Sequence, residues 1–260
     1  MRTPMTLLAP ALLALAAACC AAPLARAAGE PEAPTRSWAL RVESGVVASG
    51  YNDVRVPNDG GTRFSLSEDL DASSSGFWRL ALERSLGARH RLILTAAPCR
   101  IDASGALDKE LRFAGETFAA STELDARYRF DTYRLGWRYR FAPRGRLAAE
   151  LGATLLLRDA AITVEGGGRE GETTNTGLVP LVGLRLAWRA SEYLSLVLDA
   201  DALAAPQGRA EDVFLGLEWT MVPGIDLAAG YRFIEGGADV DEVYNFALIH
   251  FLTLAIAVNL

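Results

Sequence analysis

The chain has 260 residues, a formal net charge of −6 at pH 7 and a hydrophobic fraction of 50%. An acidic chain is a poor partner for nucleic acid, and two histidines leave few candidates for metal chemistry or histidine-based catalysis. Only Cys99 lies outside the leader described below, so the mature chain is expected to have no intrachain disulfide and no cysteine metal cluster.

The first 27 residues have the pattern of a secretory signal peptide. Arg2 precedes an apolar run over 7–18, and residues 25–27 form a small-x-small cleavage site. Cys19 and Cys20 leave lipoprotein processing as an alternative. We expect a signal peptide over 1–27, a polar periplasmic lead-in over 28–36 and a membrane domain over 37–260. Removal of Arg2 and Arg26 takes the formal charge from −6 to −8.

Ten later segments alternate large apolar side chains with small or polar ones, which is the period of a strand with one face in lipid. The sequence therefore predicts an all-β fold, a closed antiparallel up-and-down transmembrane β-barrel of about ten strands, with eight or twelve left open. A change of phase near Asp131 predicts a β-bulge there. The expected strands cover residues 38–49, 78–86, 90–99, 128–141, 151–158, 180–189, 194–201, 212–219, 226–233 and 246–260.

The connectors between these strands alternate between long and short. Outer-membrane barrels sort their connectors in this way, with short periplasmic turns and longer outer loops. We expect part of the second long connector, 110–118, to form a hairpin, and the run Gly166–Gly168 to provide flexibility rather than to bind phosphate. The expected long connectors are 51–75, 102–123, 165–176, 205–210 and 235–242.

Residues 246–260 end the chain with a large apolar face that only His250 interrupts. This segment resembles the closing strand of outer-membrane barrels, which the barrel-assembly machinery reads during insertion. A C-terminal membrane helix is the alternative, because 243–260 carries no formal charge. The tryptophans are expected to gather at the periplasmic edge as an interfacial belt. They are Trp38, Trp78, Trp137, Trp188 and Trp219.

Inward positions of the expected strands carry as many acidic as basic side chains. A barrel of about ten strands is narrow, and an unpaired buried charge costs several kcal/mol, so these charges should pair. The sequence predicts a salt-bridged lumen. A narrow channel for small solutes is the alternative, because inward glycines would leave room. The predicted lumen charges are Arg41, Glu43, Arg79, Glu83, Arg134, Arg138, Glu150, Arg158, Arg185, Asp199, Asp201, Asp212, Glu218 and Arg232.

Neither histidine is expected to act as a general base. His250 falls on the lipid-facing row, and His90 falls beside a short turn at the periplasmic rim. Asp199 and Asp201 share one face and could share a proton or bind a cation, although pairing with arginine explains them more simply. We expect no catalytic residue, cofactor or metal. A lipid A-modifying enzyme is an alternative that rests on analogy of fold.

Four segments at the expected outer end are less generic: 51–57 with 61–64, 112–118, 205–210 and 235–239. Together with the barrel pattern they resemble a family of small outer-membrane β-barrel proteins of Gram-negative bacteria that has no assigned activity. The resemblance implies a fold and a location. A candidate mouth cluster in these segments would hold the loops together, or bind a ligand or the phosphates of outer-leaflet lipid. It comprises Asn52, Asp53, Arg55, Arg63, Arg112, Glu116, Arg209, Glu235 and Asp239.

From these patterns we expect a monomeric, non-enzymatic outer-membrane barrel with a narrow lumen and a structural or binding role. Its expected partners are outer-membrane lipid, lipopolysaccharide and, during insertion, the barrel-assembly machinery, with no nucleic acid.

Overall fold

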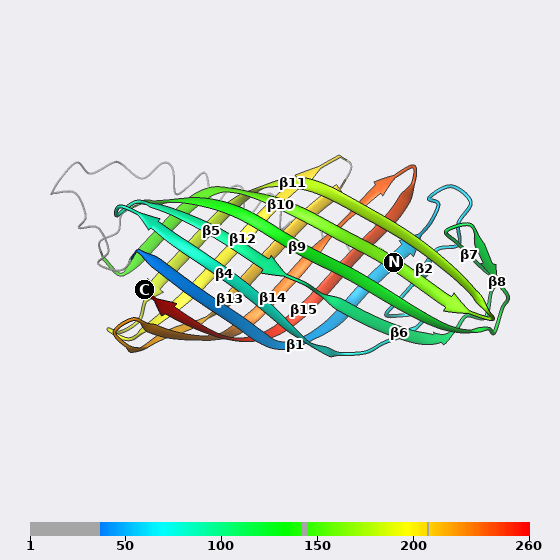
Figure 1. The fold of residues 1–260 in the computed structure, drawn as a ribbon, viewed down its shortest axis with the longest axis horizontal. Coiled ribbons are helices and arrows are strands. Elements are labelled where there is room, and N and C mark those ends of the chain that lie inside the picture. The colour runs from blue at the N-terminus through cyan, green and yellow to red at the C-terminus, as the bar shows by residue number, and fades with distance from the viewer. Residues whose placement is uncertain (1–36, 142–144, 207) are drawn as a thin grey trace, which may run out of the picture. The chain divides into compact units, whose positions relative to one another are not determined.

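The computed structural model describes residues 37–141, 145–206 and 208–260. Regular structure in these residues is β-strand, and ten strands close into an antiparallel barrel (Figure 1). The predicted fold class and strand number are therefore confirmed. The expected signal peptide and lead-in lie outside the described residues. Within the described ranges no helix is long and apolar enough to cross a membrane.

Each wall strand pairs with its neighbours along the chain, and the last strand pairs with the first to close the ring. Two further strands extend the wall: β6 (Arg100–Ala106) continues β5 along β9, and β3 (Asp71–Ala72) pairs with β6. The wall strands are β1 (Trp38–Arg55), β4 (Ser75–Leu86), β5 (His90–Ala97), β9 (Glu123–Phe141), β10 (Leu147–Gly166), β11 (Arg169–Arg189), β12 (Leu194–Ala205), β13 (Gly208–Val222), β14 (Ile225–Val240) and β15 (Val243–Asn259).

The two ends of the barrel differ, and we name them the turn end and the loop end. At the turn end the chain reverses within a few residues, for example at 87–89, 190–193 and 223–224. Trp38 and Leu260 exchange backbone hydrogen bonds there, so both ends of the described chain meet at this end. The loop end carries two long connectors. The first, 56–74, contains β2 (Phe64–Ser65) and β3, and the second, 107–122, contains the predicted hairpin, formed by β7 (Leu111–Phe113) and β8 (Glu116–Phe118).

The prediction of five long loops was wrong for three of them. The strands β10 and β11 continue to Gly166 and Arg169, so most of the expected loop 165–176 is strand. Likewise β12 ends at Ala205 and β13 begins at Gly208, and only 241–242 separate β14 from β15. These polar segments pair as extended hairpins because polar side chains on both faces of a strand are compatible with water outside a barrel.

The β-bulge expected near Asp131 is also absent from β9, which pairs with β10 without a register shift. The irregularity lies in the neighbouring strand, where Pro98 and Cys99 interrupt the ladder between β5 and β6. Proline has no backbone N–H to donate. The Asp131 carboxylate accepts a hydrogen bond from the Cys99 N–H at 3.2 Å instead.

The outer surface of the wall carries rows of exposed apolar side chains, among them Leu135, Leu155, Leu217 and Leu254. Trp38, Trp137, Trp188 and Trp219 lie in the turn-end part of their strands, as predicted. The prediction was wrong for Trp78, which lies away from the turn end because it pairs with Ser44 in the middle part of β1.

Towards the loop end the sense of the alternation reverses. Along β9 the outward residues become Glu123, Asp125 and Arg127, whereas Leu124, Ala126 and Tyr128 are buried inside the barrel. A buried apolar cluster, which we call the loop-end core, fills this part of the interior. It combines barrel residues with residues of the two long connectors, including Val54, Phe64, Leu66, Leu70, Leu111, Phe113, Phe118 and Ile162.

Candidate functional site

Charged side chains fill the interior between the loop-end core and the turn end. We call them the lumen charge network. They come from nine of the ten wall strands, because period two points every second residue inward. Eight arginines and seven carboxylates make ion pairs here. They are Arg41, Arg79, Arg91, Arg134, Arg138, Arg140, Arg185, Arg232, Glu43, Glu83, Glu150, Asp199, Asp201, Asp212 and Glu218.

Asp212 on β13 lies at the centre of one part of this network. Its carboxylate is 3.0 Å from Arg79, 2.6 Å from Arg134 and 2.5 Å from Arg232, and its side chain is 3% exposed. Arg232 also donates to Glu43, at 2.9 Å and 3.1 Å. Because these residues come from β1, β4, β9, β13 and β14, the contacts cross the lumen and tie distant wall strands together.

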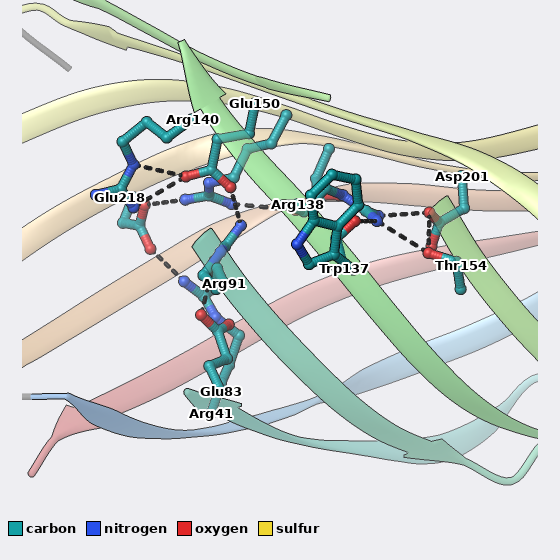
Figure 2. A network of polar contacts seen from close by, with 12 residues as sticks. Arg41, Glu83, Arg91, Trp137, Arg138, Arg140, Glu150, Thr154, Asp201 and Glu218 are labelled. Carbon is teal, nitrogen blue, oxygen red and sulfur yellow. Dashed lines mark hydrogen bonds and ion pairs between the residues drawn. The ribbon is translucent and has the colours of Figure 1, made fainter. Parts of the chain in front are cut away.

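A second part of the network lies nearer the turn end and is drawn in Figure 2. Arg91 bridges Glu83 at 2.6 Å and Glu150 at 2.5 Å. Beside it Arg138 reaches Asp201 at 2.5 Å, and the Thr154 hydroxyl donates to the same carboxylate at 2.8 Å (Figure 2). Asp199 and Asp201 each lie beside arginine, so neither offers the other a shared proton.

The inward glycines do not leave open space. A Cβ atom at Gly183 would lie 2.0 Å from the Arg138 guanidinium carbon, and one at Gly230 would lie 2.7 Å from the Phe214 ring. Glycine at these positions therefore makes room for a neighbouring side chain. The prediction that the inward glycines leave room for a small solute is therefore wrong.

Of the fourteen predicted lumen charges, thirteen make ion pairs in the interior, and Arg158 differs. Among the described residues it makes no ion pair, and its guanidinium donates a hydrogen bond to Asn175 on β11. Sequence reasoning missed Arg91 and Arg140, which lie close to the turns at the ends of β5 and β9. Both residues lie at inward positions of the predicted strands 90–99 and 128–141, so the same alternation identifies them.

The candidate mouth residues do not form one cluster. Asp53 accepts from Arg63 at 2.6 Å, which raises the pKa of the Arg63 side chain, and Arg63 lies over the Tyr244 ring. Asn58 joins Arg55 to Asp239. These residues lie on the outer side of the β1–β15 wall.

The other mouth residues lie in three separate places. Arg209 pairs with Glu235, which also accepts from the Tyr51 hydroxyl. Asn52 is fully buried and accepts from Asn245 at 3.0 Å. Arg112 and Glu116 lie on the β7–β8 hairpin, beside Glu110 and Arg169 respectively.

Both histidines lie against aromatic rings. His90 stacks on Trp137, and His250 shares a hydrogen bond of 2.5 Å with the Tyr231 hydroxyl. In the described ranges no group of three or more His, Cys, Asp or Glu side chains could hold a metal ion.

Three cavities follow one another through the barrel. A cavity of about 310 Å³ lies beside the loop-end core, one of about 70 Å³ lies within the charge network, and one of about 320 Å³ lies at the turn end. The small middle cavity shares Arg134 and Asp212 with the first and Glu83 and Glu218 with the third. The interior is therefore narrowest where the charges meet.

Comparison with known proteins identifies the fold. The outer membrane protease OmpT from Escherichia coli matches with a TM-score of 0.56 and 10% identity, over 89% of this chain and 99% of that one. The fold is that of an outer-membrane β-barrel. Two other barrels match with lower TM-scores. The attachment invasion locus protein Ail of Yersinia pestis has 0.37, with 10% identity over 87% of this chain and 100% of that chain. The translocator domain of the autotransporter NalP from Neisseria meningitidis has 0.44, with 14% identity over 97% and 94%.

No family model matches the sequence, and no curated protein matches it. At these identities the structural matches establish the fold alone.

Proposed function

We propose that the protein is a monomeric outer-membrane barrel whose lumen is closed by the charge network, with a structural or binding role and no catalytic activity. One observation carries this proposal: six carboxylates and six arginines of the charge network line the lumen at its narrowest point and pair there. Moving a solute past them would separate buried ion pairs, and each broken pair would cost several kcal/mol. The exposed apolar rows of the wall support a place in lipid.

The rival function is a narrow channel. The observation that favours it is the run of three cavities that share lining residues. Rearrangement of a few ion pairs would join the cavities into one path.

Planar-bilayer recording distinguishes the two functions. The closed-lumen proposal predicts that the wild-type protein shows no stable large conductance. The double variant Arg138→Ala, Asp201→Ala removes an ion pair that has no net charge and removes the side chain that covers Gly183. Its recordings should therefore show more conductance events than those of the wild type. The matched control is Arg129→Ala, Asp159→Ala, which removes an ion pair from the outer face of the wall. A stable large conductance in the wild type would contradict the closed lumen.

The absence of enzymatic activity has its own test. Lipid A from cells that overproduce the protein should have an unchanged mass spectrum, and a new modification would support the lipid-modifying alternative.

We further propose that the chain belongs to a family of small barrels without assigned activity. A signal peptide directs it out of the cytoplasm, and its polar mouth residues meet lipopolysaccharide.

A further inference from the structure

The cavity beside the loop-end core is mainly apolar, unlike the other two interior cavities. Its lining includes Leu156, Ile162, Val179, Leu181 and Ile249, from strands β10, β11 and β15. Its volume of about 310 Å³ is roughly twice that of an engineered apolar cavity of about 150 Å³ that binds benzene. Ligand pockets in proteins are typically apolar with a few polar groups that fix orientation.

One of the polar groups that border this cavity is a cation without an acidic partner. Arg158 lies on the inward face of β10, and among the described residues it makes no ion pair. Its Nε atom is buried without a hydrogen-bond partner. The other end of its guanidinium donates to Asn175 at an exposed contact, whereas a buried polar atom without a partner, such as this Nε, is costly. Every other arginine on the inward face of the wall strands lies beside a carboxylate, and Arg158 differs from them in making no ion pair with the described residues.

The wall next to this cavity contains an unpaired strand edge. The β11–β12 ladder begins at the pair Val182–Ala202, and β11 residues 169–181 have no partner on β12. Figure 1 shows the β12–β13 hairpin ending well short of the tip of the β10–β11 hairpin. Nearer that tip, Phe113 of the β7–β8 hairpin lies beside Gly171. The backbone edge of β11 over 173–181 is therefore unpaired with β12, and we call this edge the window.

The window lies at the level of the apolar rows. Leu178, Pro180 and Val182 face outward on β11, and Leu178 and Val182 are 65% and 47% exposed. Proline has no N–H, and in sheets it is confined to edges and similar unpaired positions. Thr174 and Asn175, both exposed, border the cavity from the same edge. A molecule dissolved in the surrounding lipid would thus meet apolar side chains at the window and polar groups behind it.

We propose that this cavity binds an amphiphile with one carboxylate, that its head group pairs with Arg158 while its apolar body lies against Val179, Leu181 and Ile249, and that it arrives from the lipid through the window. Four carboxylates, those of Glu211, Asp212, Glu235 and Glu242, line the cavity from β13 and from the β14–β15 hairpin, and Asp212 already pairs with Arg134. Glu235 already pairs with Arg209. The head group therefore belongs on the β10 side, beside Arg158. The inference gives the binding role proposed above a ligand class and rests on it.

The test uses decanoate as the probe and the full barrel in nanodiscs of uncharged phospholipid. The decanoate carries a ¹³C-labelled carboxyl carbon. Binding is measured as the saturable amount of decanoate in nanodiscs with protein that exceeds the amount in protein-free nanodiscs. Wild type should bind, and Arg158→Gln should weaken binding about tenfold or more, the loss expected for a hydrogen bond to a charged group. The matched control is Arg127→Gln, an exposed arginine on the outer face of β9, which should bind as wild type does.

Two further variants separate binding from folding and from route. Ala160→Phe adds a ring to the lining and should abolish binding while Arg158 stays in place. The pair Leu181→Cys, Leu203→Cys lies one position beyond the first pair of the β11–β12 ladder, and the disulfide form of this variant should take up decanoate more slowly than the reduced form of the same variant. Circular dichroism must show that each variant keeps the strand content of the wild type.

Equal binding by wild type and Arg158→Gln would overturn the proposal, and so would stronger binding of decyltrimethylammonium than of decanoate. Conductance recorded on the same preparations keeps the two proposals apart. A barrel that conducts yet binds decanoate through Arg158 contradicts the closed lumen alone, and a silent barrel without saturable binding contradicts the ligand site alone.

Discussion

Replacement of Asp212 by asparagine should destabilise the barrel more than any other single change in charge. Asp212 lies within 3.0 Å of three arginines, with its own side chain 3% exposed. After the substitution Arg232 keeps Glu43 and Arg134 keeps Asp201, but Arg79 loses the one ion pair that it makes within the described part of the chain. Removing one partner of a buried ion pair typically costs about 3–5 kcal/mol. We expect a loss of that size in the free energy of unfolding.

The assay is unfolding by guanidinium chloride in lipid vesicles, followed by tryptophan fluorescence. The matched control is Asp159→Asn, because Asp159 also pairs with an arginine at 2.5 Å but lies on the outer face of the wall, where solvent screens the pair. A second variant, Arg79→Met with Asp212→Asn, removes the stranded charge and should recover part of the loss. If Asp212→Asn destabilised the barrel no more than Asp159→Asn, the structural role of the charge network would be refuted.

Three further predictions concern the apolar parts of the barrel. Phe113→Ala removes a fully buried ring from the loop-end core, and it should cost about 3–5 kcal/mol and expose the connector 107–122 to protease. Leu254→Arg places a charge on an outward position that is 68% exposed, and it should cost about 2–4 kcal/mol of vesicle unfolding energy, whereas Asp125→Arg beyond the apolar rows should cost much less. Cys99 is 6% exposed, so maleimide should label it only after unfolding, and rapid labelling of the native barrel would contradict its burial.

The part of the fold at the level of the apolar rows could be predicted from the sequence. There the environment alternates between lipid and a charged interior, so each strand has period two with opposite character on its faces, as in 133–141 of β9. The same reading found thirteen members of the lumen charge network. It left out Arg91 and Arg140, although both occupy inward positions of the predicted strands 90–99 and 128–141.

Beyond the apolar rows the sequence reading failed for a physical reason. Where the wall has water outside, outward residues become polar, as in Glu165, Glu170 and Glu172 of the β10–β11 hairpin. A segment of this kind has the composition of a loop. The buried residues Phe64, Leu66 and Phe113 do carry a signal, since so many apolar side chains are unusual in solvent-exposed connectors. The window and the isolated Arg158 depend on register between distant strands, which a single sequence does not specify.

The central claim is that β15 and its neighbours face hydrocarbon on one side and a packed interior on the other. The most direct test places a nitroxide at each position from 246 to 258 in reconstituted protein, and measures collisions with oxygen and with a water-soluble nickel complex. The account predicts oxygen collisions that alternate with period two, with maxima at Leu252, Leu254 and Ile256. Uniform accessibility, or contact with the nickel complex at those three positions, would contradict it.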